Sequence, residues 1–386
     1  MKVKGGEQML VGLDGKRAVE NNTGLGNYSR YAVNIMSVAF PGTRFRLYAP
    51  RERDNDRLSP LLDRENVDIA YARTSFGGLG RALWRTIDMP VTLGRDGVTV
   101  YHGLSNELPL TIGRVCPSVV TIHDIIYRRC KADYSAIDRE LYDFKYSRSA
   151  RIANRVIAIS ECTRRDIIED YQIDPAKIDV IYQGIDPIFS LDIPTAKKQE
   201  IRQKYSLPDT YIASVGTVQP RKNQLLAVQA LAMLPEAVKL VIVGRMSGDY
   251  GTKLKAEISR LGLSDRVMHL EGIPFVDLPS VYACAALSVY PSRYEGFGLP
   301  VVESITAGTP VIAATGSCLE EAGGDGAVYI DPDDCRALAE NALHILDDRI
   351  FRDKLVRHGA RHVRKFSAEN FARATMAAYN KAIISF

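Results

Sequence analysis

Residues 290–314 read YPSRYEGFGLPVVESITAGTPVIAA and decide the fold of the second half of the chain. An apolar strand leads into a polar turn, the turn leads into a helix opened by Pro300, and a second apolar strand follows. This order predicts a parallel sheet covered by helices. Glu295 lies in the turn and Glu303 on the first turn of the helix, with seven residues between them.

Both carboxylates are expected at the carboxyl end of the sheet, where α/β folds bind ligands. Gly296 and Gly298 let the backbone approach a ligand, and the unpaired amides at a helix start favour an anion. Glu303 could accept two hydrogen bonds from a vicinal diol such as a ribose, and Glu295 could bind a sugar ring. The alternative is a surface loop followed by a helix with an ordinary acidic first turn. The two glutamates alone favour this alternative over a ligand site.

The whole stretch resembles the donor-site signature of the retaining glycosyltransferases of family four, which carry the same two glutamates in a nearly identical EGFGLP frame. The match is long and ungapped, and therefore far more specific than a lone glycine motif. The resemblance implies an α/β fold of the GT-B type, with two doubly wound Rossmann-like domains facing each other across a cleft. It also implies that Phe297, Gly298 and Leu299 belong to the donor site with Glu295 and Glu303.

Composition points to a soluble globular protein, with 46% hydrophobic and 25% charged residues among 386. No apolar run approaches the roughly 20 residues of a membrane span, and the first residues lack a signal-peptide core, so we expect a cytoplasmic protein. The six cysteines form no CxxC pair and are expected to be reduced. A net charge of +4 is too small to indicate a nucleic-acid partner.

Basic residues gather at two places, Arg81 and Arg85 around Trp84, and a late helix with six lysines and arginines between 352 and 365. Solvated helix faces explain most such runs. The minor alternative is peripheral association with the inner membrane, or docking of a lipid-linked acceptor.

Apolar strands alternate with amphipathic helices along the chain, and the pattern restarts near residue 211. We predict domains at 1–190 and 191–366, a linker at 184–208, and a helix at 367–386 that the resemblance places back on the first domain. Predicted strands of the first half are 10–14, 44–48, 67–71, 98–102, 119–123, 156–159 and 180–182. Those of the second half are 212–215, 239–243, 267–270, the strand ending at 290, and 310–314.

The sequence GTVQPRKN places Arg221 and Lys222 just beyond a strand of the second domain. Two adjacent cations there can hold a diphosphate and stabilise the charge that grows as a phosphate leaves, although a bare RK pair is more often a solvated turn. Family members carry a lysine at the place of Lys222. Many have arginine where this chain has Thr217, and Arg221 is the natural substitute.

Near the N-terminus, Gly24, Leu25 and Gly26 lie between the first strand and its helix. The turn is a weak phosphate motif by itself, because Ser29 stands where a dinucleotide fingerprint has its third glycine. In the family, the corresponding loop closes over the donor phosphates or contacts the acceptor, so the resemblance implies that Gly24, Leu25 and Gly26 bind the donor.

Histidines end two strands of the first half, His102 in VYHG and His123 in TIHD. Such a histidine commonly caps its strand through a backbone hydrogen bond. The family has an equivalent His-Asp pair near the transferred sugar, which implies a catalytic role for His123. We assign His102 and Asp124 to the acceptor side.

The run Asp331-Pro332-Asp333 spells the DxD of metal-dependent sugar transferases, but it opens a helix, so we predict Asp333 or Asp334 to be its N-cap. No metal and no obligatory cofactor are expected, since Arg221, Lys222 and helix amides can supply the electrostatics.

We therefore predict a retaining hexosyltransferase that uses a nucleoside diphosphate sugar and a glycan or lipid-linked acceptor. GDP-mannose is favoured, because GTVQPRKN is similar to the motif of bacterial mannosyltransferases of surface polysaccharide synthesis, and a UDP-sugar stays open. The catalytic residues would be His123, Glu295, Arg221 and Lys222. The alternatives are a non-catalytic sugar-nucleotide-binding scaffold, or another GT-B enzyme such as a sugar-nucleotide epimerase.

Overall fold

The computed structural model describes residues 8–22, 24–72, 84, 88–190 and 192–386. The chain divides into two compact units. Unit 1 is built from the chain up to Tyr127, from Tyr134–Gly184 and from Ser367–Phe386, and unit 2 from Arg128–Asp133 and Ile185–Phe366. The last helix, α17 (Ala368–Ile384), is therefore part of unit 1.

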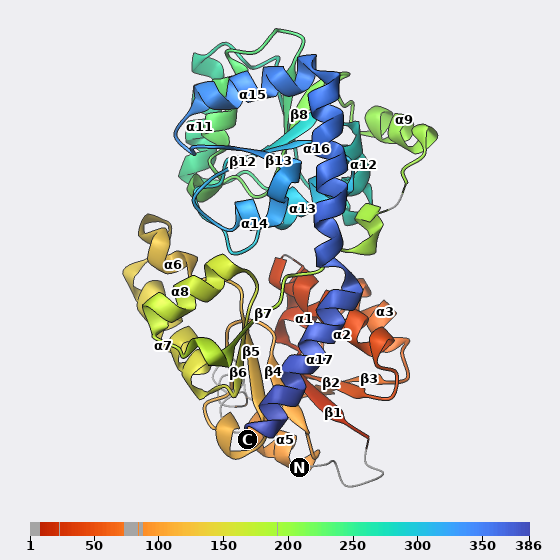
Figure 1. Ribbon diagram of the computed structural model, residues 1–386, viewed down its shortest axis with the longest axis vertical. Coiled ribbons are helices and arrows are strands. Elements are labelled where there is room, and N and C mark those ends of the chain that lie inside the picture. The colour runs from red at the N-terminus through yellow and green to blue at the C-terminus, as the bar shows by residue number, and fades with distance from the viewer. Residues whose placement is uncertain (1–7, 23, 73–83, 85–87, 191) are drawn as a thin grey trace. The chain divides into compact units, whose positions relative to one another are not determined.

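Unit 1 contains a seven-stranded parallel sheet in the order β3-β2-β1-β4-β5-β6-β7 (Figure 1). Its strands are β1 (Leu10–Asp14), β2 (Arg44–Ala49), β3 (Val67–Tyr71), β4 (Val100–Gly103), β5 (Ser118–Ile122), β6 (Arg155–Ala158) and β7 (Ile178–Val180). The α-helices along this part of the chain are α1 (Lys16–Glu20), α2 (Gly24–Ala39), α3 (Ser59–Leu62), α5 (Met89–Arg95), α6 (Ile126–Arg129), α7 (Ala136–Ile152) and α8 (Glu161–Tyr171).

Successive side chains along the strands of unit 1 point to opposite faces of the sheet and pack into two separate cores. On β4, Val100 packs into the core shared with α2 and α17, whereas its neighbour Tyr101 packs into the core shared with α5, α7 and α8. The same alternation places Val119 and Val120 of β5 on opposite faces. Helices therefore cover both faces of the sheet, as parallel sheets require.

Unit 2 contains a six-stranded parallel sheet in the order β10-β9-β8-β11-β12-β13. Its strands are β8 (Tyr211–Val215), β9 (Lys239–Val243), β10 (Val267–Leu270), β11 (Leu287–Tyr290), β12 (Val311–Ala314) and β13 (Ala327–Ile330). The α-helices are α9 (Thr195–Lys204), α10 (Gln224–Leu231), α11 (Gly248–Arg260), α12 (Leu278–Cys284), α13 (Leu299–Thr306), α14 (Leu319–Gly323), α15 (Cys335–Asp347) and α16 (Arg349–His362). Counted from its first strand, the order is that of a Rossmann fold, with its switch point between β8 and β11.

The predicted strands all form, and their bounds shift by no more than two residues. The predicted linker 184–208 is wrong in part, because its charged run folds as α9. That helix buries Ile201 completely, and Arg202 donates hydrogen bonds to the carbonyls of Pro208 and Cys284. The Lys, Gln, Glu and Arg residues of this run have high helix propensity, and the burial of Ile201 together with these contacts docks the helix.

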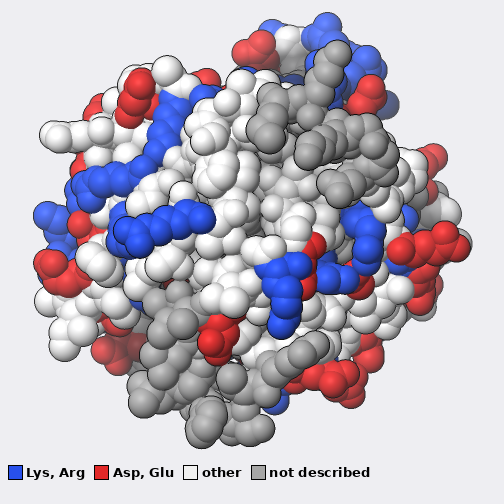
Figure 2. All heavy atoms as spheres, turned by 90° about the horizontal axis from the view of Figure 1, so that it is seen from below, with Lys and Arg blue, Asp and Glu red and all other residues white. Residues whose placement is uncertain are grey.

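Of the two basic regions named from the sequence, the structure describes the late one but not the arginines of the early one. Arg81 and Arg85 lie outside the described residues, while the late basic run belongs to α16 and the short helix after it, Val363–Phe366. On the face drawn in Figure 2, the described Lys and Arg side chains lie in separate groups among acidic and uncharged ones. Among the described residues, no helix is long and apolar enough to cross a membrane.

Candidate functional site

The switch point of unit 2 brings together the loops that follow β8 and β11. The Asn223 side chain donates hydrogen bonds to the carbonyls of Pro291, at 3.2 Å, and Pro332, at 2.7 Å. The Arg293 amide donates to the carbonyl of Arg221 at 2.8 Å. Asn223 holds a left-handed backbone with φ of 58°, a conformation that asparagine tolerates well, and this lets the short helix Pro220–Lys222 turn directly into α10.

Three charged groups meet at this switch point. One carboxylate oxygen of Glu295, Oε1, lies 2.5 Å from Arg221 Nη1 and 2.6 Å from Lys222 Nζ. The hydroxyl of Tyr290 donates to the same oxygen at 3.1 Å and also contacts Lys222 Nζ. The Lys222 ammonium lies 4.6 Å from the centre of the Tyr290 ring. Residues 221–222 and 295, predicted separately, therefore form one cluster.

Burial and mutual attraction set the charges of this cluster. Burial by itself would raise the pKa of Glu295, but Lys222 and Arg221 outweigh it and lower the pKa to about 2. Burial lowers the pKa of the Lys222 ammonium, and Glu295 opposes that change. Glu295 is thus ionised at neutral pH, and the cluster carries one net positive charge when both cations are protonated. Such a charge suits an incoming anion.

Glu303 occupies a different environment on α13. Its Oε2 accepts a hydrogen bond of 3.2 Å from the hydroxyl of buried Tyr282. Burial raises the pKa of Glu303 to about 7; the Tyr282 hydrogen bond and the charge of Lys222 lower it, and Asp186 raises it further. Lys222 therefore acts on both glutamates. At neutral pH the Glu303 carboxylate is poised between its two protonation states.

The turn between the two glutamates is closely packed. Gly298 has φ of 98°, and a Cβ there would lie 2.6 Å from Leu319 Cδ2, so this position requires glycine. The Phe297 ring is buried against Phe366, with ring centres 5.1 Å apart. Leu299 is the first residue of α13. Phe297 therefore offers a ligand its backbone and not its ring.

The Asp331-Pro332-Asp333 run has structural roles. Asp334 caps α15 by accepting a hydrogen bond from the Ala337 amide at 2.8 Å, which confirms the N-cap prediction. Asp333 lies 2.6 Å from Arg293, and Asp331 accepts from the Asp333 amide. Within the described ranges, no group of three or more His, Cys, Asp or Glu side chains could hold a metal ion.

In unit 1, Gly24, Leu25 and Gly26 form the first turn of α2. Gly24 is exposed, whereas Gly26 is buried so tightly that a Cβ would lie 1.7 Å from the carbonyl oxygen of Asn21. The close packing of α1 against α2 therefore requires Gly26. Gly24 and Leu25 are the members of the turn with exposed surface.

His123 follows the end of β5 and is almost completely buried. Its Nε2 lies 2.8 Å from the carbonyl of Leu104, which can only accept, so Nε2 carries the proton. Its Nδ1 then accepts from the Gln183 amide at 3.2 Å. The ring packs edge-on against Tyr28, and burial lowers the pKa of His123 to about 4. The imidazole is therefore neutral at pH 7.

His102 has no exposed surface in unit 1. Its Nδ1 lies 2.8 Å from the Tyr379 hydroxyl of α17, and its Nε2 lies 2.8 Å from the Thr121 hydroxyl. Burial, with a smaller effect of His123, lowers the pKa of His102 to about 3. This position ties α17 to the sheet. Asp124, half-buried, accepts a hydrogen bond from the Ile126 amide at the start of α6.

Two tyrosines of unit 2 were missed by sequence reasoning. Tyr290 and Tyr282 each place a hydroxyl on one of the two glutamates, Glu295 and Glu303. Tyr290 is the last residue of β11 and Tyr282 lies on α12, so both resemble core aromatics in the sequence. The sequence signal that could have identified them is the tyrosine hydroxyl, because a buried tyrosine usually has a hydrogen-bond partner.

Comparison with protein families gives two matches that together cover most of the chain. Residues 10–189 match the model described as Glycosyltransferase Family 4, and residues 197–362 match Glycosyl transferases group 1. The chain is 31% identical over 378 residues to O-antigen chain mannosyltransferase B of Escherichia coli, covering 92% of this chain and 96% of that protein. It is 30% identical over 225 residues to O-antigen chain mannosyltransferase RfbU of Salmonella typhimurium, covering 58% and 59%.

Solved structures share the fold at low sequence identity. A crystal structure of Anabaena HepE in complex with UDP-glucose matches with a TM-score of 0.74 and 19% identity over 96% of this chain and 99% of that one. Sucrose-phosphate synthase from Thermosynechococcus elongatus matches with a TM-score of 0.73 over 98% and 100%. These matches and the two doubly wound sheets confirm the predicted GT-B fold.

Proposed function

The chain belongs to glycosyltransferase family four and is a hexosyltransferase, and we propose that it moves a mannosyl group from GDP-mannose to an acceptor hydroxyl with retention of anomeric configuration. The observation that carries this proposal is the Arg221–Glu295–Lys222 cluster at the switch point of unit 2. It supplies cations for a diphosphate and a carboxylate for a sugar within one buried site.

In the proposed reaction, the bond between the anomeric carbon and the diphosphate oxygen breaks, and the oxygen keeps the electron pair. Lys222 and Arg221 stabilise the charge that develops on the leaving diphosphate. The acceptor hydroxyl attacks the same face of the sugar, and its proton passes to the leaving phosphate oxygen. Glu295 is already ionised by its two cations, and its role is to position the sugar.

The nucleoside would be held by Glu303, whose carboxylate can accept hydrogen bonds from both ribose hydroxyls. The backbone of Phe297, Gly298 and Leu299 would contact the diphosphate from the start of α13. These assignments place every proposed contact with the nucleotide within unit 2.

For unit 1 we propose contacts with the transferred sugar and the acceptor. His123 is neutral and both of its ring nitrogens are engaged by Leu104 and Gln183, so it would contact the sugar through a hydrogen bond only by exchanging one of these partners, and it would not act as an acid. Gly24 and Leu25 are the proposed contacts in the first turn of α2. We place His102 in a supporting role, because it has no exposed surface.

The preference for a mannosyl donor is supported by the two O-antigen mannosyltransferases that the chain resembles, and a UDP-sugar is the competing donor. Incubation with GDP-mannose and UDP-glucose should raise the melting temperature more for the true donor, because a ligand of the native state stabilises it. We expect the larger shift with GDP-mannose. Equal shifts would remove the preference.

Turnover separates an enzyme from a binding scaffold. Release of nucleoside diphosphate in the presence of acceptor, with a product of the same anomeric configuration by NMR, is the expected result. Binding of donor without release under any acceptor condition would favour the scaffold, and an inverted product would reject the retaining mechanism.

Metal independence is a separate part of the proposal. Activity should survive EDTA, because Arg221 and Lys222 supply the charge that a divalent cation supplies elsewhere. Loss of activity that returns only when a divalent metal is added would contradict it.

A further inference from the structure

Two segments carry the chain between the units, and they are joined where they enter unit 2. The long stretch of unit 2 begins at Ile185 and ends at Phe366, and the chain continues in unit 1 from Ser367. The Ile185 amide donates a hydrogen bond to the Phe366 carbonyl at 3.3 Å. This bond connects the two crossing segments, Gly184–Ile185 and Phe366–Ser367.

Within unit 1, both crossing segments lead to Tyr31 of α2. A Cβ on Gly184 would lie 1.7 Å from the Tyr31 hydroxyl oxygen, so a larger residue there would displace the tyrosine ring. The Tyr31 ring also meets Phe371, in the first turn of α17, with ring centres 5.4 Å apart. Both segments are therefore anchored at one residue of unit 1.

Within unit 2, Phe366 packs directly on the donor turn. Its side chain is 1% exposed, and its ring meets the Phe297 ring edge-on, with centres 5.1 Å apart and planes at 85°. The edge-to-face arrangement is one that aromatic pairs favour. Phe297 follows Glu295 in the turn whose backbone we propose contacts the diphosphate. The last residue of unit 2 therefore touches the proposed donor site.

The end of α16 also holds α14, which packs on the same turn. His362 Nε2 lies 2.9 Å from the Glu321 carbonyl, and Lys365 Nζ donates to that carbonyl at 3.0 Å. Leu319, in the same helix as Glu321, packs against Gly298 of the turn. The residues that precede the second crossing thus support the donor turn from two directions.

Tight packing connects α16 to α13, the helix that carries Glu303. A Cβ on Gly359 of α16 would lie 2.5 Å from Ile305 Cγ2 of α13, and a Cβ on Gly326 would lie 2.2 Å from Gly359 Cα. These contacts leave no room for an added methyl group. Close-packed interiors of this kind transmit small displacements, so a movement of α13 would reach α16.

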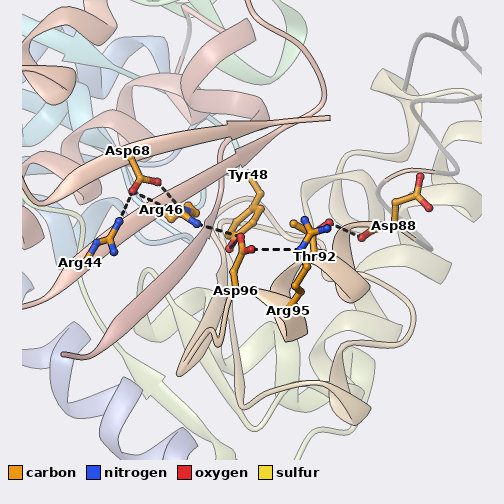
Figure 3. A network of polar contacts seen from close by, with 8 residues as sticks. All are labelled: Arg44, Arg46, Tyr48, Asp68, Asp88, Thr92, Arg95 and Asp96. Carbon is orange, nitrogen blue, oxygen red and sulfur yellow. Dashed lines mark hydrogen bonds and ion pairs between the residues drawn. The ribbon is translucent and has the colours of Figure 1, made fainter. Parts of the chain in front are cut away.

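A polar network at the sheet edge of unit 1 provides a contrast. Arg46 bonds to both Asp68 and Asp96, and the Tyr48 hydroxyl donates to Asp96 at 2.9 Å (Figure 3), beside a cavity of about 590 Å³. These groups satisfy one another, and all of them belong to unit 1. Tyr48 is 1% exposed, as Phe366 is, so it offers a matched buried ring outside unit 2.

Resting on the proposed function, we propose that Phe366 is a positioning residue for the donor. Acting through Phe297, it couples binding of a nucleoside diphosphate at the donor turn to the ordering of the two crossing segments. A diphosphate held by the backbone of the turn restrains the Phe297 ring, and that ring restrains Phe366, whose carbonyl accepts the Ile185 amide. Because coupling between binding and ordering is reciprocal, loosening Phe366 weakens nucleotide binding.

Hydrogen–deuterium exchange of the full chain, with and without saturating GDP, tests this coupling at the Ile185 amide. Hydrogen exchange reports local opening, so GDP should slow exchange at Ile185 at least about threefold. In Phe366→Leu, GDP at a concentration that restores saturation should no longer slow it. Calorimetry should show GDP affinity about fivefold lower in this variant, as expected for loss of one aromatic pair.

Further variants separate this role from a general loss of stability. Phe297→Leu should match Phe366→Leu, and the double variant should lose no more than either single one, because both rings act through one contact. Phe351→Leu, on the same helix α16 with its ring stacked on His344, and Tyr48→Leu should keep the full effect of GDP. Phe366→Met, which keeps a large apolar side chain, replaces Phe366→Leu if that variant does not fold.

The outcomes distinguish this coupling from the proposed function. If GDP slows exchange in residues 295–299 but not at Ile185, or if folded Phe366→Leu keeps the full effect, the coupling is wrong and the proposed function stands. If UDP alone binds and slows Ile185, the coupling holds and the donor preference fails. If neither nucleotide binds the parent chain, the proposed function fails and the coupling with it.

Discussion

The two units share the order of their central strands but differ in the candidate catalytic side chains at the strand ends, which are charged in unit 2 and neutral in unit 1. In unit 2 the loops after β8 and β11 bring Glu295 against Arg221 and Lys222, and the pKa of the glutamate falls to about 2. In unit 1 the histidines at the ends of β4 and β5 are buried, and the pKa values of His102 and His123 fall to about 3 and 4. The strand ends of unit 2 therefore carry charged groups, whereas the two histidines at the strand ends of unit 1 are neutral.

The charged site of unit 2 and the neutral site of unit 1 suit different parts of the proposed reaction. A leaving diphosphate needs fixed positive charge, whereas a sugar or acceptor hydroxyl needs neutral hydrogen-bonding groups that do not compete for its proton. The same architecture can serve both tasks because the loops, and not the strands, carry the chemistry.

Lys222→Ala should have the largest effect, because it removes one of the two cations that we propose face the diphosphate. We expect kcat to fall on the order of 10²- to 10³-fold. Glu295 keeps its contact with Arg221, so circular dichroism and thermal melting should show a folded protein. Lys255→Ala, at an exposed position of α11, is the matched control. Unchanged kcat in folded Lys222→Ala would remove the lysine from the reaction.

Glu303→Ala should weaken nucleotide binding by about 2–4 kcal/mol, since two charge-assisted hydrogen bonds to the ribose would be lost. Isothermal titration calorimetry with the nucleoside diphosphate measures this directly. Tyr282→Phe, which removes only the hydroxyl that contacts Glu303, should have a smaller effect. Unchanged affinity in Glu303→Ala would show that the ribose binds elsewhere.

Nucleotide affinity should depend on pH through Glu303. Its pKa in the free protein is about 7, and a ribose that hydrogen-bonds to the carboxylate favours the ionised form, so binding lowers the pKa and releases a proton. Affinity should therefore rise from pH 6 to 8, by up to about tenfold per pH unit below 7. Glu303→Gln should abolish this dependence. A parent protein with a flat profile would contradict the assignment.

Tyr290→Phe should have the smallest effect. Its hydroxyl touches both Lys222 and Glu295, so removing it loosens the cluster without changing any charge. We expect a loss of about 1 kcal/mol, or roughly fivefold in kcat, with KM for acceptor unchanged. An equal effect on KM for acceptor would indicate a general disturbance of the fold.

Sequence patterns predicted most of the fold because the strands are rich in apolar residues. They missed α9, because its charged run was interpreted as a linker although its residues have high helix propensity and Ile201 is buried. They also named Arg221, Lys222 and Glu295 but did not predict that these side chains contact one another. Their contact depends on β8 pairing with β11, a long-range fact that local patterns do not contain. Tyr282 and Tyr290 were missed because both resemble core aromatics in the sequence.

The central claim is that the cluster of unit 2 holds the diphosphate of the donor. A crystal structure of the chain with bound GDP tests it most directly. The account predicts diphosphate oxygens within hydrogen-bonding distance of Lys222 and Arg221, and both ribose hydroxyls on the Glu303 carboxylate. A nucleotide bound away from these residues, with the Glu295 ion pairs undisturbed and Glu303 facing no ligand, would contradict it.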